Sequence, residues 1–324
     1  MSNYSETFSN IYTGRPSGQQ LYLHEKISCV PISNVATVAS EKCFALLGYA
    51  CDEGVKRNLG RPGAANGPDA IRKQLGKLPN HLPTETLVYD VGTLQGLEGD
   101  MEETQQALGD SICQLLQQKH FPIVLGGGHD VAYGSYNGLK KYVGQGETIG
   151  IINFDAHFDL RNNLQVDNNI LNNSGTPFYQ IAQDCEAEGT LFKYLCLGIR
   201  KDANDRTLFE TAKELDVKYV MRDTFRIQFH NEINAWINAF TSNVDHIYVT
   251  IDLDGFSSAY APGVSAPSPM GFTPDVVLES LKTIMGSGKL RVMDIAELNP
   301  EFDVDNQTAK LAASLVHCIL HDLP

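Results

Sequence analysis

Short apolar segments alternate with amphipathic ones along almost the whole chain, and this alternation limits the possible folds more than any other feature. Eight segments read as strands, at residues 43–50, 86–92, 121–127, 148–154, 194–199, 217–221, 246–252 and 290–298. Most are almost continuously apolar, which is typical of strands buried on both faces of a parallel sheet. We therefore predict an α/β fold with a mostly parallel, eight-stranded sheet.

Three of the intervening segments carry helical signals. Residues 101–120 repeat apolar residues at helical spacing, with acidic residues near the start and basic ones at the end. Residues 275–285 follow Thr273 and Pro274, a pair that is typical of a helix start. Residues 305–320 form the last amphipathic segment. Alternating strands and helices predict crossover connections between parallel strands.

The beginning of the chain differs from the rest. Residues 1–40 are polar and irregular, so we expect an N-terminal arm that lies on the domain surface or on a partner subunit. Residues 41–324 show no composition break and no linker, which predicts a single catalytic domain.

Charge and cysteine usage restrict the possible partners and the compartment. The net charge is −14 and no basic run occurs, so nucleic acid and anionic membranes are not expected as partners. The seven cysteines are dispersed, as is typical of reduced thiols in a cytosolic protein. We see neither a signal peptide nor an apolar run near the roughly 20 residues that span a membrane. We expect a soluble, cytoplasmic protein.

The stretch "NFDAHFD" (153–159) places Asp155, His157 and Asp159 at strict alternation after an apolar strand. Alternate residues of a strand share one face, so these three side chains should converge. A solvated strand exit is the simpler alternative, but it does not require a histidine between two aspartates.

Three other predicted strands end in similar residues. His129 follows "VLGGG", Asp252 and Asp254 alternate in "TIDLD", and Glu297 lies in "DIAEL". Functional side chains in parallel α/β sheets gather beyond the carboxyl ends of the strands. We therefore expect these residues to meet the "NFDAHFD" group at one edge of the sheet.

Four aspartates at one edge would repel one another unless cations lie between them. Two divalent ions would balance the four negative charges, and six ligands are too many for one tetrahedral zinc. An oxygen-rich set with two imidazoles favours Mn²⁺, with Zn²⁺, Co²⁺ and Fe²⁺ as alternatives. Two such ions sharing a water lower its pKa and make a nucleophile for hydrolysis.

The motifs "GGGHD", "DAHFD" and "TIDLD", in this order and spacing, resemble the three signature motifs of the ureohydrolase (arginase/agmatinase) family. The resemblance covers residues 43 to 320 and implies a three-layer α/β/α, arginase-like fold with two Mn²⁺ per chain. The ligands it implies for one ion are His129, Asp155, Asp159 and Asp252. Those it implies for the other are Asp155, His157, Asp252 and Asp254. Glu297 matches the glutamate that contacts the amidine or guanidine group.

Departures from the arginase pattern point to one branch of the family. Ser174 stands where arginases and agmatinases usually have a histidine, and Arg161 stands where arginases have an asparagine. The strings "DAHFDLR", "SGTPF", "ANDRTLF" and "APGVSAP" resemble the formimidoylglutamase branch. That resemblance implies hydrolysis of N-formimidoyl-L-glutamate to L-glutamate and formamide in histidine degradation. The alternatives are a guanidine hydrolase (agmatinase or arginase) and an inactive metal-binding scaffold.

An anionic small-molecule substrate gives the departures a physical meaning. Arg161 can bind a carboxylate through two parallel hydrogen bonds. The alternatives are a role at a helix start and a surface ion pair. Arg200 is a weaker candidate with a structural salt bridge as its alternative, and Asn204 is a candidate by resemblance alone. We expect Ser174 to contribute to substrate binding, since a neutral hydroxyl is a poor base. The proton would then move through Asp254 or ordered water. We also expect a homo-oligomer.

Overall fold

All eight predicted strands form and lie in one sheet. The computed structural model describes residues 4–37, 42–96, 99–162, 164–166 and 169–324. The eight strands are β3 (Cys43–Ala50), β4 (Leu87–Gln95), β5 (Phe121–Leu125), β6 (Ile149–Phe154), β9 (Lys193–Ile199), β10 (Lys218–Met221), β11 (His246–Asp252) and β12 (Leu290–Ala296). Their observed bounds differ from the predicted ones by three residues at most, so the predicted strands are confirmed.

Within the described residues the sheet has ten strands, two more than predicted. The added strands are β1 (Tyr4–Ser5) and β2 (Ser28–Cys29), which both pair with β4. Each has only two residues, too few to carry an alternation pattern. The sheet order is β1-β4-β3-β5-β12-β11-β6-β9-β10, and every pairing is parallel except that of β1 with β4. A separate hairpin pairs β7 (Leu164–Val166) with β8 (Asn169–Leu171).

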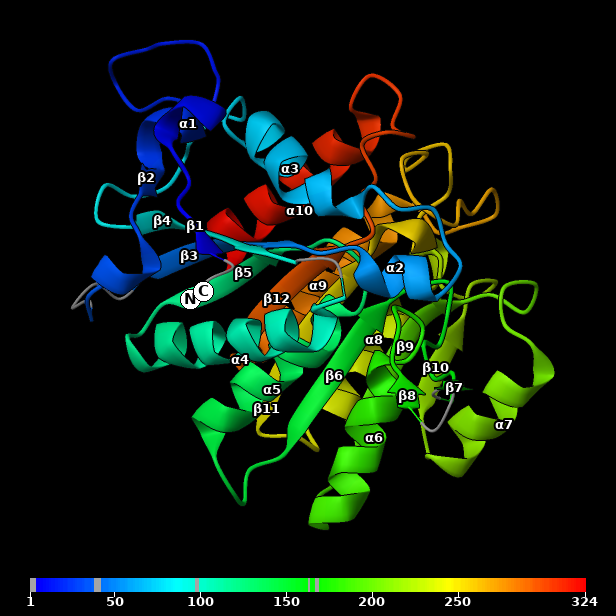
Figure 1. Ribbon diagram of the computed structural model, residues 1–324. Helices are drawn as coiled ribbons and strands as arrows, with labels where there is room; N and C mark the ends of the chain where they lie inside the picture. The colour runs from blue at the N-terminus through cyan, green and yellow to red at the C-terminus, as the bar shows by residue number, and fades with distance from the viewer. Residues whose placement is uncertain (1–3, 38–41, 97–98, 163, 167–168) are drawn as a thin grey trace.

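Helices cover both faces of the sheet, which confirms the three layers (Figure 1). One face carries α3 (Gly67–Leu75), α8 (His230–Thr241), α9 (Pro274–Gly286) and α10 (Gln307–Asp322). The other carries α4 (Met101–Gln117), α5 (Val131–Val143), α6 (Pro177–Glu188) and α7 (Arg206–Glu214). Alternate residues of β3 feed the two cores, with Phe44 and Leu46 in one and Ala45 and Leu47 in the other.

The remaining helices in the described ranges are short. Two are α-helical, α1 (Leu23–Lys26) and α2 (Glu53–Arg57). Five are single 3₁₀ turns: η1 (Ser9–Ile11), η2 (Ile32–Asn34), η3 (Ala64–Asn66), η4 (Ile227–Phe229) and η5 (Leu253–Gly255). No helix in the described part of the chain is long and apolar enough to cross a membrane.

The N-terminal segment packs onto the domain and is less irregular than its sequence suggests. Leu23, Ile27 and Ile32 are buried, and β1 and β2 lie along the edge of β4. Residues 1–3 and 38–40 of the predicted arm lie outside the described residues. The described part of the arm therefore contributes to the sheet and to the core.

A buried ion pair joins this segment to the sheet. Arg72 on α3 is fully buried, with its Nε 2.7 Å from Asp90 Oδ2 on β4 and its Nη1 2.7 Å from Thr93 Oγ1. The hydroxyl of Tyr12, from the N-terminal segment, also donates to Asp90. The charge-assisted bonds satisfy Asp90 in a place that water does not reach.

Replacing Arg72 should destabilise the fold strongly. Arg72→Met leaves the Asp90 carboxylate buried without its cation, which should lower the free energy of unfolding by about 3–5 kcal/mol. Urea denaturation followed by circular dichroism measures this change. Asp69→Ala is the matched control, because Asp69 also pairs with Arg72 (3.2 Å) but its side chain is 60% exposed. The control should cost no more than about 1 kcal/mol. Equal losses in the two variants would contradict the role given to Asp90.

Candidate metal centre

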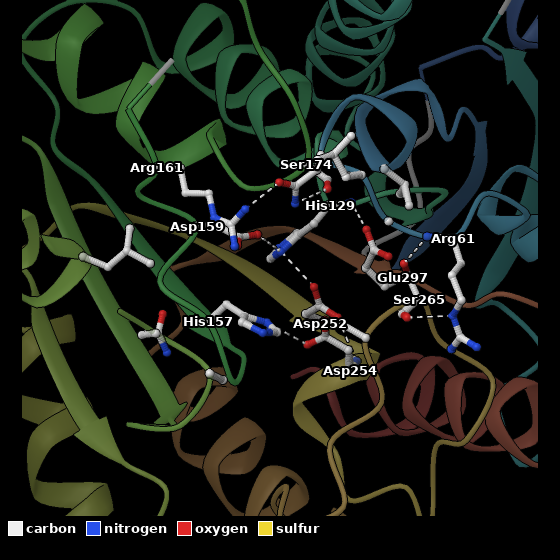
Figure 2. Close-up of a pocket in the computed structure, with 18 residues that line it drawn as sticks. Arg61, His129, His157, Asp159, Arg161, Ser174, Asp252, Asp254, Ser265 and Glu297 are labelled. Atoms are coloured by element: carbon white, nitrogen blue, oxygen red, sulfur yellow. Dashed lines mark hydrogen bonds and ion pairs between the residues drawn. The ribbon is translucent and has the colours of Figure 1, made fainter. Parts of the chain in front are cut away.

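A cavity of about 320 Å³ opens at the carboxyl edge of the sheet. Residues at or just beyond the ends of β5, β6, β11 and β12 line it, and these four strands are consecutive neighbours in the order β5-β12-β11-β6. Figure 2 shows His129, His157, Asp252 and Asp254 pointing toward one another within it. The strand ends thus meet at one place, as expected for a parallel sheet.

The first group of candidate ligands surrounds one nitrogen of His129. Its Nδ1 lies 3.3 Å from Asp155 Oδ2, 2.9 Å from Asp159 Oδ2 and 3.0 Å from Asp252 Oδ2. The four ligand atoms lie within 4.8 Å of one another, close enough to hold a single ion.

The second group surrounds His157 and shares Asp155 with the first. Nδ1 of His157 lies 3.4 Å from Asp155 Oδ1 and 3.3 Å from Asp254 Oδ1. Asp155 therefore turns one oxygen toward each group, which is the arrangement of a bridging carboxylate. Asp252 joins only the first group in this structure, and its Oδ1 accepts a hydrogen bond of 2.8 Å from the backbone N–H of Asp254.

The cluster has the chemistry of a cation site. His129 Nδ1 and Asp254 Oδ1 are buried and have no hydrogen-bond partner. Thr250 Oγ1 lies 3.0 Å from Nε2 of His129, so a proton on Nε2 leaves the lone pair of Nδ1 facing the three aspartates. These residues fit metal ions, which would satisfy both unpaired atoms.

The surroundings of the ionisable groups also indicate an excess of negative charge. Burial, and then the charges of Asp254 and Asp155, raise the pKa of Asp252 well above its ordinary value. Burial and the charge of Asp155 raise the pKa of Asp159 as well. Burial alone would lower the pKa of His129, but the surrounding carboxylates, Asp252 first, raise it well above its ordinary value. The cluster therefore favours positive charge at its centre.

The backbone is constrained where it presents these side chains. A Cβ on Gly127 would lie 1.9 Å from the carbonyl oxygen of Cys51, the residue after β3. Only glycine therefore lets the loop after β5 approach the end of β3 so closely. Asp159 and Glu297 both have left-handed backbones, with φ of 47° and 69°. Such conformations cost about 1–3 kcal/mol in non-glycine residues and cluster at functional sites.

Glu297 lies beside the cluster without belonging to either group. It follows β12 and is 4% exposed, and its Oε1 accepts a hydrogen bond of 2.8 Å from the backbone N–H of His129. Burial, followed by the charge of Asp254, raises the pKa of Glu297 to about 8. Its carboxyl group lines the cavity, where it can face a bound molecule.

Arg161 and Ser174 line the same cavity. Among the described residues, no carboxylate lies within ion-pair distance of Arg161. Its Nη1 instead donates to Asn58 Oδ1 at 2.9 Å. Ser174 is 6% exposed and accepts a hydrogen bond of 3.2 Å from Asn58 Nδ2.

Two predicted substrate contacts have other partners. Arg200 pairs with Asp202 through Nε at 3.1 Å and Nη2 at 2.6 Å, and it does not line the cavity. This bidentate ion pair is the structural alternative that was considered for Arg200. Asn204 lines the cavity, but its Oδ1 accepts from the N–H of Phe158 and its Nδ2 donates to the carbonyl of Ala156. Asn204 therefore braces the loop that carries Asp155, His157 and Asp159.

Sequence reasoning did not single out two polar residues of the cavity wall. Asn58 follows α2, and Arg61 lies three residues further on. The guanidinium of Arg61 donates to the carbonyls of Ser265 (2.9 Å) and Val264 (2.5 Å) and lies 3.7 Å from the centre of the Phe302 ring. Arg61 belongs to the segment "GRPGAANGP", whose glycines and prolines indicate a tight loop but no particular partner.

The fold and the site together define an α/β metal-dependent hydrolase with a binuclear centre at the carboxyl edge of its sheet. The chain belongs to the arginase family, whose sequence profile matches residues 42–321.

Individual relatives extend this comparison. The chain is 44% identical to the formimidoylglutamase of Aeromonas salmonicida (strain A449) over 98% of this chain and 99% of that protein. It also resembles the crystal structure of formimidoylglutamase from Bacillus subtilis, with a TM-score of 0.78, 24% identity, and 96% and 93% of the two chains covered. Trypanosoma cruzi formiminoglutamase, crystallised with Mn²⁺, gives a TM-score of 0.76 at 23% identity over 90% and 97% of the chains. The two structures share the fold of this chain.

Removing the shared aspartate should empty the centre. Asp155→Ala takes a ligand from both groups, so metal analysis after dialysis should find less than one ion per chain where the wild type holds two. His129→Ala and His157→Ala should each lose mainly one ion.

Asp130→Asn is the control, because this buried acid adjoins His129 but accepts a hydrogen bond of 2.6 Å from Tyr49 outside the cluster. It should retain both ions. Two ions still bound to Asp155→Ala would contradict a bridging role.

Proposed function

We propose that the protein is a formimidoylglutamase, which hydrolyses N-formimidoyl-L-glutamate to L-glutamate and formamide, a step of histidine degradation. The observation that carries the proposal is Arg161, which lines the cavity beside the acidic cluster and has no ion-pair partner among the described residues. A cation at this place suits a substrate with carboxylates and would repel cationic agmatine. The 44% identity to an Aeromonas formimidoylglutamase supports the same reaction.

We assign two Mn²⁺ to the centre. His129, Asp155, Asp159 and Asp252 would hold one ion, and the ligands of the other would be Asp155, His157, Asp252 and Asp254. The oxygen-rich ligand set and the manganese in the Trypanosoma cruzi structure support this choice of metal. Without cations, the acidic residues of the cavity outnumber its two arginines and would repel an anionic substrate. Metal loading would therefore precede substrate binding.

Each side chain of the cavity has a separate role in the proposed hydrolysis. When bound, the ions lower the pKa of a water and supply a nucleophile near neutral pH. The C–N bond to the glutamate nitrogen breaks, formamide keeps the other nitrogen, and the departing amine takes up a proton. A cationic amidine would favour the ionised form of Glu297, whose carboxylate would accept hydrogen bonds from the amidine nitrogens and stabilise their positive charge. Arg161 and Ser174 hold the glutamate end. Ser174 does not titrate near pH 7, so we assign the proton transfer to Asp254.

We place this activity in residues 41–324, with the N-terminal arm (1–40) outside the catalytic unit. We further infer a homo-oligomeric enzyme of the cytoplasm. All seven cysteines are free, which is compatible with a reducing compartment.

Product analysis with a small set of substrates tests the proposal. The manganese-loaded enzyme should release formamide and glutamate in equal amounts from N-formimidoyl-L-glutamate. It should release little urea from agmatine or arginine, because Arg161 repels their cationic groups. Urea as the dominant product would assign the protein to the guanidine hydrolases, and no product from any of these substrates would support an inactive scaffold.

Glu297→Gln should separate catalysis from metal binding. The glutamine can still accept the hydrogen bond from His129, but it no longer offers a negative charge to the amidine. We expect kcat to fall by about 10²–10³-fold while metal content stays near two ions per chain. Steady-state kinetics and metal analysis of the same preparation provide the measurements. Turnover near that of the wild type would show that Glu297 does not stabilise the reacting group.

A further inference from the structure

We propose that Asn58 positions Arg161 for the substrate carboxylate and thereby helps to determine specificity. The proposal rests on the proposed function, and it adds a residue that lies outside the metal cluster. Asn58 lines the cavity, and its side-chain amide bridges two other lining residues that come from the segments after β6 and after β8.

The hydrogen bonds give the amide of Asn58 one orientation. Its Oδ1 accepts from Arg161 Nη1 at 2.9 Å, and its Nδ2 donates to Ser174 Oγ at 3.2 Å. Ser174 is itself fixed, because its backbone N–H donates 3.1 Å to the carbonyl of Gly54. Figure 2 shows Arg161 and Ser174 side by side, with Arg161 extending toward Asp159 and His129. The guanidinium is therefore held at the wall of the cavity that contains the acidic cluster.

Asn58 is carried by a loop that is fixed at both ends. Its backbone N–H donates to Gly54 at 3.0 Å, and the N–H of Gly60 donates to Val55 at 2.9 Å. On the far side, Arg61 ties the loop to the carbonyls of Val264 and Ser265. Between these anchors Leu59 has a left-handed backbone, a conformation that persists only where its surroundings impose it. A side chain on such a support can place another one accurately.

A neutral partner suits this task better than an acid. An amide oxygen takes one N–H of the guanidinium and leaves its positive charge intact. Arg161 has five N–H donors, so others remain for two parallel bonds to a carboxylate. An aspartate at position 58 would also hold Arg161, but it would neutralise the charge that attracts the substrate.

Gly175 provides the space for this contact. A Cβ at this position would lie 3.2 Å from both Arg161 Cδ and Asn58 Nδ2, which is closer than ordinary van der Waals contact. Its backbone φ is not in the left-handed region, so alanine can adopt the same conformation. Gly175→Ala therefore offers a second way to disturb the pair without removing either side chain.

The test compares two substrates. One is N-formimidoyl-L-glutamate, and the other is N-methylformamidine, which has the reacting group but no carboxylate. Asn58→Ala should raise KM for the first substrate about three- to ten-fold, the usual cost of ordering one flexible side chain on binding. Its kcat for that substrate and its kcat/KM for N-methylformamidine should change less than two-fold. Asn58→Asp and Gly175→Ala should also raise KM for the first substrate only.

A double-mutant cycle identifies Arg161 as the residue through which Asn58 acts. Arg161→Ala should raise KM for N-formimidoyl-L-glutamate about ten- to a hundred-fold, since it removes a charge-assisted bidentate contact. Adding Asn58→Ala to Arg161→Ala should then change KM less than two-fold. Asn34→Ala is the control for general effects, because Asn34 is exposed and does not line the cavity.

Three results would overturn the proposal: independent effects of the two substitutions, equal losses on both substrates, or an unchanged KM in Asn58→Ala. An inactive wild type would instead overturn the proposed function.

Discussion

Repulsion between carboxylates is the constraint around which the rest of this molecule is arranged. Four aspartates meet at the ends of two neighbouring strands, and two unit charges 4 Å apart interact by roughly 4 kcal/mol at an effective dielectric constant of 20. The sheet can carry that cost because its strands are buried on both faces by separate cores. The same excess of negative charge favours multivalent cations within the cavity.

Much of the fold was predictable because its signals are local. A strand buried on both faces reads as a continuous apolar run, so β3 and β11 were predicted with their observed bounds. The six predicted metal ligands lie together in the structure, because alternation along a strand and the common edge of a parallel sheet are geometric rules. The strands β1 and β2 could not be predicted, since two residues carry no period and their pairing depends on β4, which is distant in sequence.

The partners of long polar side chains could not be predicted in the same way. Arg161 and Arg200 both follow strand ends near the site, yet Arg200 turns to Asp202 and Arg161 turns to Asn58. The side-chain rotamer and the polar groups nearby determine which partner an arginine binds, and the spacing of residues in the sequence reveals neither. Asn204 shows the same limit, because an amide can brace a backbone or bind a ligand with equal chemistry. The loop after Asn58 was still recognisable as a loop, because Gly60, Pro62 and Gly63 follow in the sequence.

The way in which the N-terminal segment closes the edge of β4 has a consequence for biosynthesis. Tyr4 pairs with Leu94, and Ser28 pairs with Tyr89. The strands β1 and β2 therefore cannot pair until a strand some sixty to ninety residues further along the chain has been synthesised. Until β4 leaves the ribosome, Leu23 and Ile32 have no core to enter. The nascent chain therefore exposes apolar surface during this interval, and general chaperones bind such surface. Completion of the edge then withdraws both the apolar side chains and the unpaired backbone of β4 from other chains.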